Sequence, residues 1–467
     1  MYADTAASTL PVTCGERRQV RVALNARAMA VYLQEAFGAQ TAGVKMNSAG
    51  CHVLDVKYDP GQYCYVLYRI GTLLVTGMLR WPGSEGDIPA TAQFIPELGM
   101  RVYPFEHDPA LPGLRVAADG QAMAGVLAET LEECQGGRCR VLRCCVAPVR
   151  YRPGLRCTLR LNVWLRDTHS RDFRRRTLFA KVYNYLSEMI SAHRAMEVLS
   201  NSAPAQQGRV VFARAIAVLP ELRVILQESV EGTPLELYLS GMERDVTAGD
   251  PRGWTGVVRS AAALAAVHTA ELSVDRQRPI AEELEHFVQR ASRAATVSPV
   301  AGASLIRLAE ALPAWYDRLA DWGAEMSLSH GDCKPSQFLI GREVIAILDF
   351  DSCGMADPAS DVGTYLATLR QLGIWQSLRA NGSAAAQVRK AWLRALEDRF
   401  LEEYCTATNE GADFRRRAIW HEAVGLMRKA IRAFARSPRS LMPAAQVEEA
   451  WRCLETLPAA GSAQTLS

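Results

Sequence analysis

The segment Leu328–Ile340, LSHGDCKPSQFLI, carries the most information about how this chain folds and what it does. It sets His330, Asp332 and Lys334 close together and places Gln337 directly before a run typical of a β-strand. A structural turn has little use for so many ionisable groups. A site that positions a hydroxyl, a metal ion and a phosphoryl group does need them, because phosphoryl transfer depends on positioning and charge neutralisation.

Composition and charge are those of an ordinary globular protein. The chain has 467 residues, of which 49% are hydrophobic and 22% charged, enough for two or three domains with apolar cores. A net charge of +3 argues against a dedicated nucleic-acid binder or an acidic-membrane binder. The basic runs Phe173–Arg176 and Phe414–Arg417 are interpreted as solvated faces. No apolar run is long enough to span a bilayer.

The cysteines favour a reducing compartment. There are 12, none in a CxxC pair, and the densest group lacks the second ligand pair of a zinc site: Cys134, Cys139, Cys144 and Cys145. The N-terminal stretch has neither the basic nor the apolar region of a secretory signal. We therefore expect a cytoplasmic protein that binds neither membrane nor nucleic acid, and its oligomeric state has no sequence signature.

A β-rich segment followed by a mainly helical one indicates a bilobal α+β architecture. Strand patterns occupy His52–Trp81, Val141–Asp167, Thr177–Asn184 and the start of Arg223–Leu235. Short strands around Phe338–Ile340 and Val344–Leu348 interrupt the helical part. Helical spacing of apolar residues is found over Val22–Ala39, Ala122–Cys134, Tyr185–Ser200, Trp254–Thr269, Ile280–Ala294, Ala301–Trp322, Gln387–Cys405 and Arg416–Phe434.

The β-rich segment contains a repeat. The stretch Lys57–Cys64, KYDPGQYC, matches Arg150–Cys157, RYRPGLRC, in Tyr, Pro, Gly and Cys, and a basic residue leads both copies. Strand patterns flank each copy, so a degenerate duplication explains the match better than a shared turn alone. The second copy has Lys181 in its next strand, where the first has Met78 at a roughly matching place. Only the second copy is equipped for chemistry.

The loop and the strand after it can divide the labour of phosphoryl transfer. A hairpin of this length brings Asp332 close to Asp349, which stands at the end of the neighbouring strand. Asp332 can accept a proton from an attacking hydroxyl while Asp349 and the amide oxygen of Gln337 hold a cation. Oxygen ligands suit Mg²⁺, which completes its shell with phosphate oxygens and water. Lys334 adds a positive charge that can follow the transferred group.

These motifs resemble the aminoglycoside phosphotransferase and choline kinase family, distant relatives of the protein kinases. The stretches HGDCKPSQ (His330–Gln337) and ILDFDSCGMADPASDVG (Ile347–Gly363) are similar to that family's HGD-x4-N loop, I-D-[FW]-[DE] strand end and G-D-P-x-x-D segment. QESVEG (Gln227–Gly232) and LAAVHTAEL (Leu264–Leu272) stand in the expected order. Each motif is loose, but their joint order and spacing are specific.

The resemblance implies a protein-kinase-like fold with a β-rich N-lobe and a mostly helical C-lobe. An N-terminal α+β cap with the degenerate strand repeat would occupy residues 1–140, the N-lobe 141–228 and the C-lobe 229–467. The resemblance further implies an ATP-dependent, Mg²⁺-using enzyme. That enzyme would transfer the γ-phosphoryl group to a hydroxyl of a small molecule.

It also implies a role for individual residues. Asp332 would be the catalytic base, assisted by Lys334, and Asp349 would be the principal metal ligand together with Gln337. Lys181 would hold the α- and β-phosphates. Backbone groups of the connector would present adenine, through the carbonyl of Glu228 and the amide of Val230. The resemblance gives His330 and Asp361 a bracing role at the loop, and His268 is expected to be a satisfied core residue.

The acidic partner of Lys181 is open on the sequence alone. Glu197 shares a face of the following helix with apolar residues and is the favoured partner. Glu188, nearer the helix start, can simply complement the helix dipole. An exposed acid without a role is nearly as good an explanation of Glu197.

Two features depart from the family's pattern. Gln337 stands where the family has Asn, one methylene shorter, so the metal must shift or the loop must relax. Bacterial maltokinases, from the same superfamily, resemble this chain in having Gln there and in their long N-terminal extension. No GxGxxG loop is present, so the hairpin RYRPGLRC would cover the phosphates, with Arg152 or Arg156 supplying charge, or would be only a turn.

The sequence allows three functions. A small-molecule kinase is favoured, and a catalytically weak nucleotide-binding regulator is the alternative, supported by Gln337 and the Met78 copy. A protein kinase is disfavoured because no activation segment of kinase length separates LDFD from ADPASD. The acceptor has no legible signature: Glu282, Glu283 and Glu285 would suit an aminoglycoside, but a solvated helix start explains them equally, and a sugar is as credible.

Overall fold

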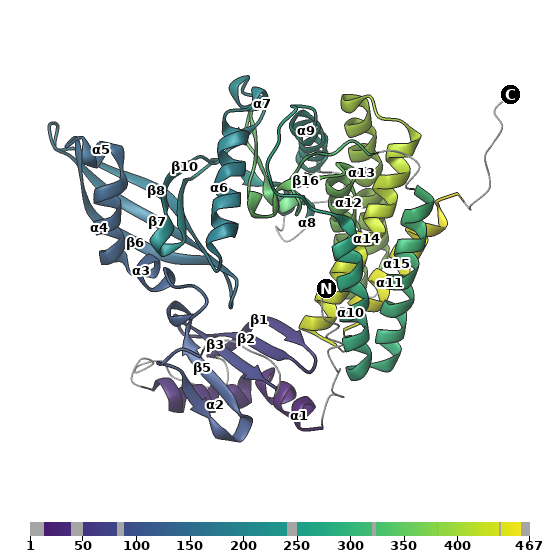
Figure 1. Cartoon of the computed structure of the whole chain (residues 1–467), viewed down its shortest axis with the longest axis horizontal. Coiled ribbons are helices and arrows are strands. Elements are labelled where there is room, and N and C mark those ends of the chain that lie inside the picture. Colours follow the sequence, from purple (N-terminus) through teal and green to yellow (C-terminus); the bar gives the residue numbers. More distant parts are fainter. Residues whose placement is uncertain are drawn as a thin grey trace, which may run out of the picture.

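The computed structural model describes residues 14–38, 50–81, 88–240, 250–319, 324–380, 382–438 and 440–458. Two five-stranded sheets lie on one side of the molecule and a large group of helices on the other, as Figure 1 shows. This confirms the expected α+β architecture with a helical C-terminal part. Within the described residues, none of the helices combines the length and apolar character that crossing a membrane requires.

The first sheet is antiparallel, in the order β1-β2-β3-β5-β4. Its strands are β1 Cys51–Asp59, β2 Tyr63–Ile70, β3 Leu73–Arg80, β4 Gln93–Ile95 and β5 Met100–Pro104. Helices α1 (Cys14–Ala23) and α2 (Ala26–Phe37) supply apolar side chains to the same core. The single helix expected from Val22 is wrong here, because the Asn25 side chain caps a new helix by accepting from two backbone N–H groups.

The second sheet is also antiparallel, in the order β10-β11-β8-β7-β6. Its strands are β6 Cys139–Arg152, β7 Arg156–Asp167, β8 Phe173–Tyr183, β10 Ala215–Leu219 and β11 Val224–Glu228. Helices α3 (Leu114–Ala118) and α4 (Gly120–Thr130) pack on it, since Leu114, Met123 and Leu127 share its core. The helix expected to continue to Cys134 breaks at Leu131, whose backbone is extended, and α5 (Glu132–Gln135) follows.

The duplication seen in one hairpin extends to the whole sheet. Both sheets place their strands in the same order along the chain and across the sheet. Each sheet ends in a hairpin that turns through a 3-10 segment of sequence Pro-Glu-Leu, Pro96–Leu98 in the first and Pro220–Leu222 in the second. A residue with left-handed backbone follows each, Gly99 (φ 59°) and Arg223 (φ 53°). From the sequence alone, only the first hairpin of this repeat was recognised.

The matching Tyr and Gly of the repeat have matching partners. In the first copy a Glu16 carboxylate oxygen accepts from the Tyr58 hydroxyl and from the Gly61 N–H, each at 2.9 Å. In the second copy Asp108 accepts from the Tyr151 hydroxyl and from the Gly154 N–H, each at 2.7 Å. Both glycines have φ near 70°, so a side chain there would strain the turn. A buried carboxylate therefore fixes the same hairpin in both sheets.

The C-terminal part is built from helices α8 to α15: Leu235–Ser240, Pro251–His268, Ile280–Val297, Pro299–Leu319, Ala359–Arg379, Ala384–Thr408, Ala412–Arg436 and Met442–Glu455. The helix α12 was not predicted, because buried residues surround it and leave no amphipathic period; α15 was missed as well. The expected ends at Ala39 and Trp322 lie outside the described residues.

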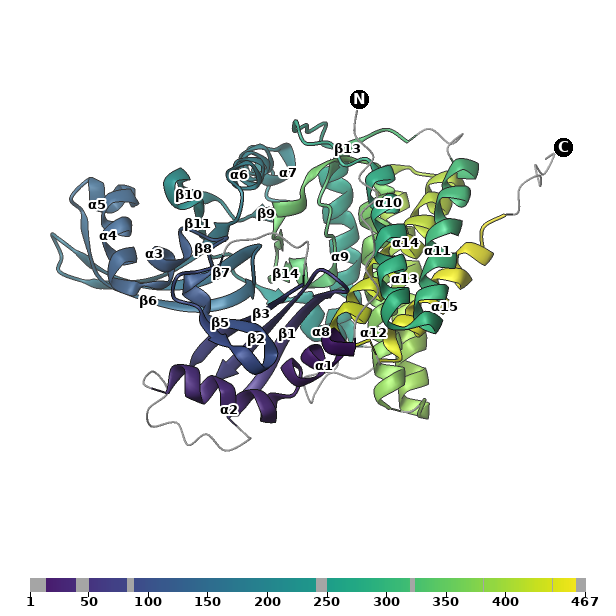
Figure 2. The same cartoon turned by 60° about the horizontal axis from the view of Figure 1, so that its bottom comes forward.

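Short strands place the catalytic loop among these helices. The strands β14 (Phe338–Ile340) and β15 (Ile345–Ile347) form the expected hairpin and join β12 (Thr233–Pro234) and β9 (Val211–Phe212) in one sheet. The strand β13 (Ser327–Ser329) pairs with β16 (Gly354–Ala356). Helices α6 (Leu186–Ser200) and α7 (Ala203–Gln206) connect this region to the second sheet, and Figure 2 shows β1 of the first sheet running toward the C-terminal helices.

Candidate functional site

The loop after β13 is held by two side chains. Asp361, in the first turn of α12, accepts from the backbone N–H groups of His330 and Gly331. The His330 ring donates through Nε2 to the Leu348 carbonyl at 2.8 Å and accepts at Nδ1 from the Asp332 N–H at 3.3 Å. The ring proton is therefore on Nε2, and Nδ1 is the acceptor. His330 and Asp361 therefore sit in the bracing positions that the resemblance implied.

A third side chain supports Asp361 from behind. The Nε2 of His268 lies 3.2 Å from an Asp361 oxygen, and its Nδ1 lies 2.7 Å from the Tyr404 hydroxyl. Burial by itself would raise the pKa of Asp361, but the hydrogen bonds and the charge of this set outweigh it and lower that pKa to about 2. His268 is buried and satisfied, and it acts on the loop only through Asp361.

Lys181 and Asp349 meet although they are far apart in the chain. Asp349 follows β15 with a left-handed backbone (φ 69°), and its carboxylate accepts from Lys181 Nζ at 2.7 Å. The Gln337 amide nitrogen donates to the other oxygen of Asp349 at 3.0 Å, which leaves its amide oxygen to face elsewhere. Burial opposes ionisation of Asp349, but Lys181 and Arg156 hold its pKa well below the usual range. Asp349 is thus a carboxylate at neutral pH.

Asp351 is a site residue that the sequence analysis missed. Its carboxylate accepts from Lys181 Nζ at 3.0 Å and from the Tyr183 hydroxyl at 2.8 Å, and it forms an ion pair with Arg156. The signal was available, because Asp351 fills the last position of the I-D-[FW]-[DE] pattern. Burial disfavours the ammonium of Lys181, yet Asp351 and Asp349 together raise its pKa.

The structure does not bring Glu197 to Lys181. The Glu197 side chain is 60% exposed, and its ion-pair partner is His193 of the same helix. Glu188 is exposed as well. The face of α6 that carries Met189 and Met196 packs inward without Glu197, so the expected pairing is corrected to Asp349 and Asp351.

The two connector residues lie at the end of the second sheet. Glu228 is the last residue of β11, and its carboxylate pairs with Arg214 at 3.1 Å and with Arg176 at 3.6 Å. Val230 follows in the segment that leads to β12. A narrow space nearby is lined by Lys181, Met196, Gln227 and Asp349, among others.

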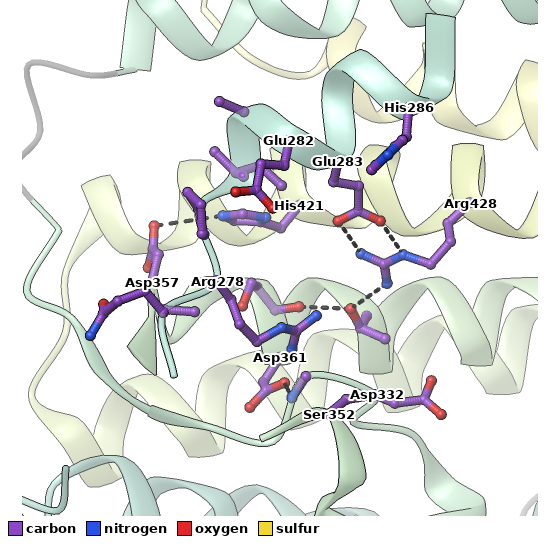
Figure 3. Close-up of a pocket in the computed structure, with 18 of the residues that line it drawn as sticks. Arg278, Glu282, Glu283, His286, Asp332, Ser352, Asp357, Asp361, His421 and Arg428 are labelled. Carbon is purple, nitrogen blue, oxygen red and sulfur yellow. Dashed lines mark hydrogen bonds and ion pairs between the residues drawn. The ribbon is translucent and has the colours of Figure 1, made fainter. Parts of the chain in front are cut away.

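Asp332 faces a large cavity. It is ionised, because Lys334 and Arg432 lower its pKa in spite of burial, and Lys334 Nζ donates directly to it. The cavity has a volume of about 750 Å³ and is bounded by the β6–β7 turn, the segment before α10, α10 itself and α14. Figure 3 shows Arg278 beside the Asp332 loop. A side chain at Gly331, whose φ is 79°, would collide with the Arg278 guanidinium.

The acidic patch expected at the start of α10 is mostly unavailable. Glu283 is held by two hydrogen bonds from Arg428, which Figure 3 draws. Glu285 is exposed and is not part of the cavity wall, whereas Glu282 lines it. The remaining acids of the wall are also paired: Asp357 contacts Arg417 and His421, and Asp361 braces the loop. The wall therefore offers little negative charge to a cationic acceptor.

The oxygen atoms around Asp349 are of a kind that fits Mg²⁺. Within the described residues, no group of three or more His, Cys, Asp or Glu side chains is arranged to hold a metal ion by itself. The carboxylates of Asp349 and Asp351 and the amide oxygen of Gln337 are the hard donors that Mg²⁺ accepts when phosphates and water complete its shell. In the structure, the Lys181 ammonium forms ion pairs with the carboxylates of Asp349 and Asp351.

Comparisons with known proteins identify similar sequences and structures. A family model described as the phosphotransferase enzyme family matches residues 159–420, more than half of the chain. Choline kinase from Cryptosporidium parvum Iowa II is 9% identical over 72% of this chain and 95% of that chain, with a TM-score of 0.45. Plasmodium vivax ethanolamine kinase is 9% identical over 71% and 87%, with a TM-score of 0.45. A glucosamine kinase is 14% identical over 87% and 92%, with a TM-score of 0.42. The search of curated proteins found no match.

Proposed function

The chain belongs to the phosphotransferase enzyme family, and from that premise we propose that it transfers the γ-phosphoryl group of ATP to a hydroxyl of a small molecule. One observation carries the proposal. Lys181 and Gln337 both contact Asp349, which follows the β14–β15 hairpin, and an ionised Asp332 on the loop before this hairpin faces the large cavity. Phosphoryl transfer needs groups of these three kinds, which bind phosphate, hold the metal and accept the proton.

Asp332 is the proton acceptor in this proposal. The acceptor hydroxyl lies in the cavity at Asp332, whose carboxylate takes the proton as the oxygen attacks the γ-phosphorus and the bond to the β-phosphate oxygen breaks. A low pKa keeps Asp332 ionised and ready to accept. Lys334 stays beside it and offsets the negative charge of the phosphoryl group.

Lys181, Asp349 and Gln337 bind the other substrate. Lys181 exchanges one of its two carboxylate partners for α- and β-phosphate oxygens of ATP. Asp349 and Gln337 would hold Mg²⁺, which supplies neutralisation of the phosphate charges when bound. The backbone of Glu228 and Val230 at the end of β11 would contact adenine.

The cap, N-lobe and C-lobe division is also a proposal. The cores favour a cap boundary near Phe105 instead of residue 140, because α3 and α4 share apolar contacts with the second sheet. The cap then consists of the first sheet with α1 and α2. The boundary between N-lobe and C-lobe near Glu228 needs no change, since β11 ends there.

The test is turnover of ATP by the purified chain with Mg²⁺ against sugars, amino alcohols and aminoglycosides. Asp332→Asn should lower the turnover number by about 10²–10⁴-fold, the usual contribution of a general base. The rise of the unfolding midpoint caused by ATP should stay, since Asp332 does not hold the nucleotide. Glu285→Gln is the control: it also neutralises an acid, but on an exposed position outside the cavity wall.

Three other results would change or overturn the proposed function. Turnover that survives in Asp332→Asn removes Asp332 from the mechanism. ATP binding without turnover of any acceptor favours the alternative, a nucleotide-binding regulator. No ATP binding at all overturns the proposed function.

A further inference from the structure

We propose that the hydroxyl-bearing acceptor also carries an anionic group, a carboxylate or a phosphate, which binds between Arg152, Arg290 and Arg432 beside Asp332. The inference rests on the proposed function, because it assigns the Asp332 cavity to the acceptor and then names the acceptor's chemical class. It starts from the charges of the cavity wall.

The three arginines lie where two cavities meet. The 750 Å³ cavity at Asp332 and a second cavity of about 350 Å³, which the β1–β2 turn of the first sheet covers, share Arg152, Arg290 and Arg432 in their walls. The three come from different elements, the β6–β7 turn, α10 and α14. The fold thus brings three side chains from distant segments together where the two cavities join. We call this junction the neck, and there is room for a sugar-sized molecule on either side of it.

Among the described residues these three arginines have no ion-pair partner, whereas four arginines near them do. Arg156 pairs with Asp351, and Arg428 pairs with Glu283. Arg293 pairs with Asp59 at 2.7 Å and Arg436 with Asp55 at 3.2 Å. Apart from Glu282, the acids of both walls thus contact other side chains. Arg152, Arg290 and Arg432 are left with positive charge that the protein does not balance.

The three arginines and the cations near them repel one another. Burial lowers the pKa of Arg152 to about 10, and Arg150, Arg156 and Arg432 add repulsion. Burial and the nearby Arg428 also lower the pKa of Arg432. Lys57 of the β1–β2 hairpin faces the same neck and has its pKa lowered by burial and by Arg290. An anion bound here would relieve this repulsion and form charge-assisted hydrogen bonds, which are stronger than neutral ones.

The anion belongs to the acceptor and not to the nucleotide. Lys181 and Asp349 line a separate narrow space, whose wall includes neither Arg290 nor Arg432. Arg432 is close enough to Asp332 to lower its pKa. A molecule that presents a hydroxyl to Asp332 therefore has its next groups at the arginines. A polyamine such as an aminoglycoside would meet repulsion there.

The proposal also gives the duplicated sheet a use. The first sheet's hairpin supplies Lys57 to the second cavity, and the ion pairs of Asp59 and Asp55 fasten that hairpin to α10 and α14. The second sheet's equivalent hairpin supplies Arg152. Two copies of one turn thus approach the anion from neighbouring positions.

The binding test uses the full chain with the nucleotide site filled by a non-hydrolysable ATP analogue, so that added anions cannot occupy the γ-phosphate position. Inorganic phosphate and glucuronate are the two probes, one for each anion. Either or both should raise the unfolding midpoint by a few degrees. The rise should disappear in Arg290→Gln and in Arg432→Gln and persist in Arg307→Gln, an exposed arginine outside both walls. No rise in the wild type, or a rise that survives both substitutions, overturns the proposal.

The turnover test compares glucose, glucosamine, glucuronate and glucose 6-phosphate. An anionic member should be preferred, and Arg290→Gln and Arg432→Gln should raise its KM about 10-fold or more while the KM for ATP stays within about 2-fold. A preference for glucose or glucosamine that neither substitution changes contradicts the proposal. Anion binding in the first test with no turnover of any acceptor would overturn the proposed function and leave the anion site standing.

Discussion

Met78 holds in the first sheet the register position that Lys181 holds in the second. Met78 pairs with Tyr65 and Lys181 with Thr158, and each of these partners follows the cysteine common to both hairpins. Both side chains are buried, at 4% and 8% exposure. The first sheet has kept the shape of the second without its buried charge, which agrees with the expectation that only the second copy is chemically equipped.

Replacing either residue by the other should harm the protein, and Lys181→Met should also lower its activity. Lys181→Met should reduce turnover at least about 100-fold, because Asp349 and Asp351 lose the ammonium between them. It should also lower the free energy of unfolding by roughly 3–5 kcal/mol, since buried carboxylates are left underpaired. Steady-state kinetics and denaturant unfolding measure the two effects.

Met78→Lys should cause damage without any gain in activity. It buries an ammonium beside Arg80, which already contacts the Met78 sulfur at 3.2 Å, and should cost roughly 3 kcal/mol or more of stability. Met78→Leu, the matched apolar control, should cost less than about 1.5 kcal/mol. A neutral result for Met78→Lys would show that the pocket around position 78 admits water or a counter-ion.

Replacing Gln337 by the family's Asn should weaken metal use. Gln337 is 6% exposed and reaches Asp349 at 3.0 Å, so a side chain one methylene shorter leaves that contact open. We expect the half-saturating Mg²⁺ concentration to rise about 10-fold or more, with ATP binding in the absence of Mg²⁺ unchanged. A Mg²⁺ titration of initial rates measures this. A lower Mg²⁺ requirement in Gln337→Asn would mean that the loop is not fitted to glutamine.

Asp361 should make the free energy of unfolding depend on pH in the acidic range. Its folded-state pKa of about 2 lies below its usual value of 3.8, so its contribution to stability is present above pH 3.8 and is lost as the pH falls toward 2. The contribution is on the order of 2 kcal/mol. Asp361→Asn should be less stable at pH 7 and should show a smaller further loss between pH 4 and 2. Urea unfolding at several pH values tests this, and parallel pH profiles for both proteins would contradict it.

Glu397 should act in the opposite direction. Burial and the nearby Glu422 raise its pKa to about 8 in spite of Arg370, so the folded state holds a proton that the unfolded state loses near pH 4.5. The stability that this group contributes is therefore present below pH 4.5 and is lost as the pH rises toward 8. Between pH 4.5 and 8, the free energy of unfolding of Glu397→Gln should rise relative to that of the wild type by an amount on the order of 3 kcal/mol. Glu402→Gln, an exposed acid of the same helix, is the control, and equal slopes for wild type and Glu397→Gln would refute the prediction.

The sequence predicted spatial neighbours best where the residues are close in the chain. Asp332, Gln337 and Asp349 belong to one loop and one short hairpin, and the structure has the expected hairpin with Gln337 in contact with Asp349. Glu197 was wrong because the inward face of α6 depends on what packs against that helix. Helix α12 was not predicted for a similar reason, since its first half is buried around its whole circumference and has no amphipathic period.

The sequence by itself determined the α+β class, the hairpin repeat and the loop that carries Asp332, because these depend on periodicity and short-range spacing. Only the tertiary structure decided which charges are balanced. Arg428 and Arg432 lie one turn apart on α14, yet Arg428 is neutralised by Glu283 and Arg432 is left for an anion. Ion pairing falls off steeply with distance between side chains from different elements, and those distances exist only once the helices and the two sheets have packed together.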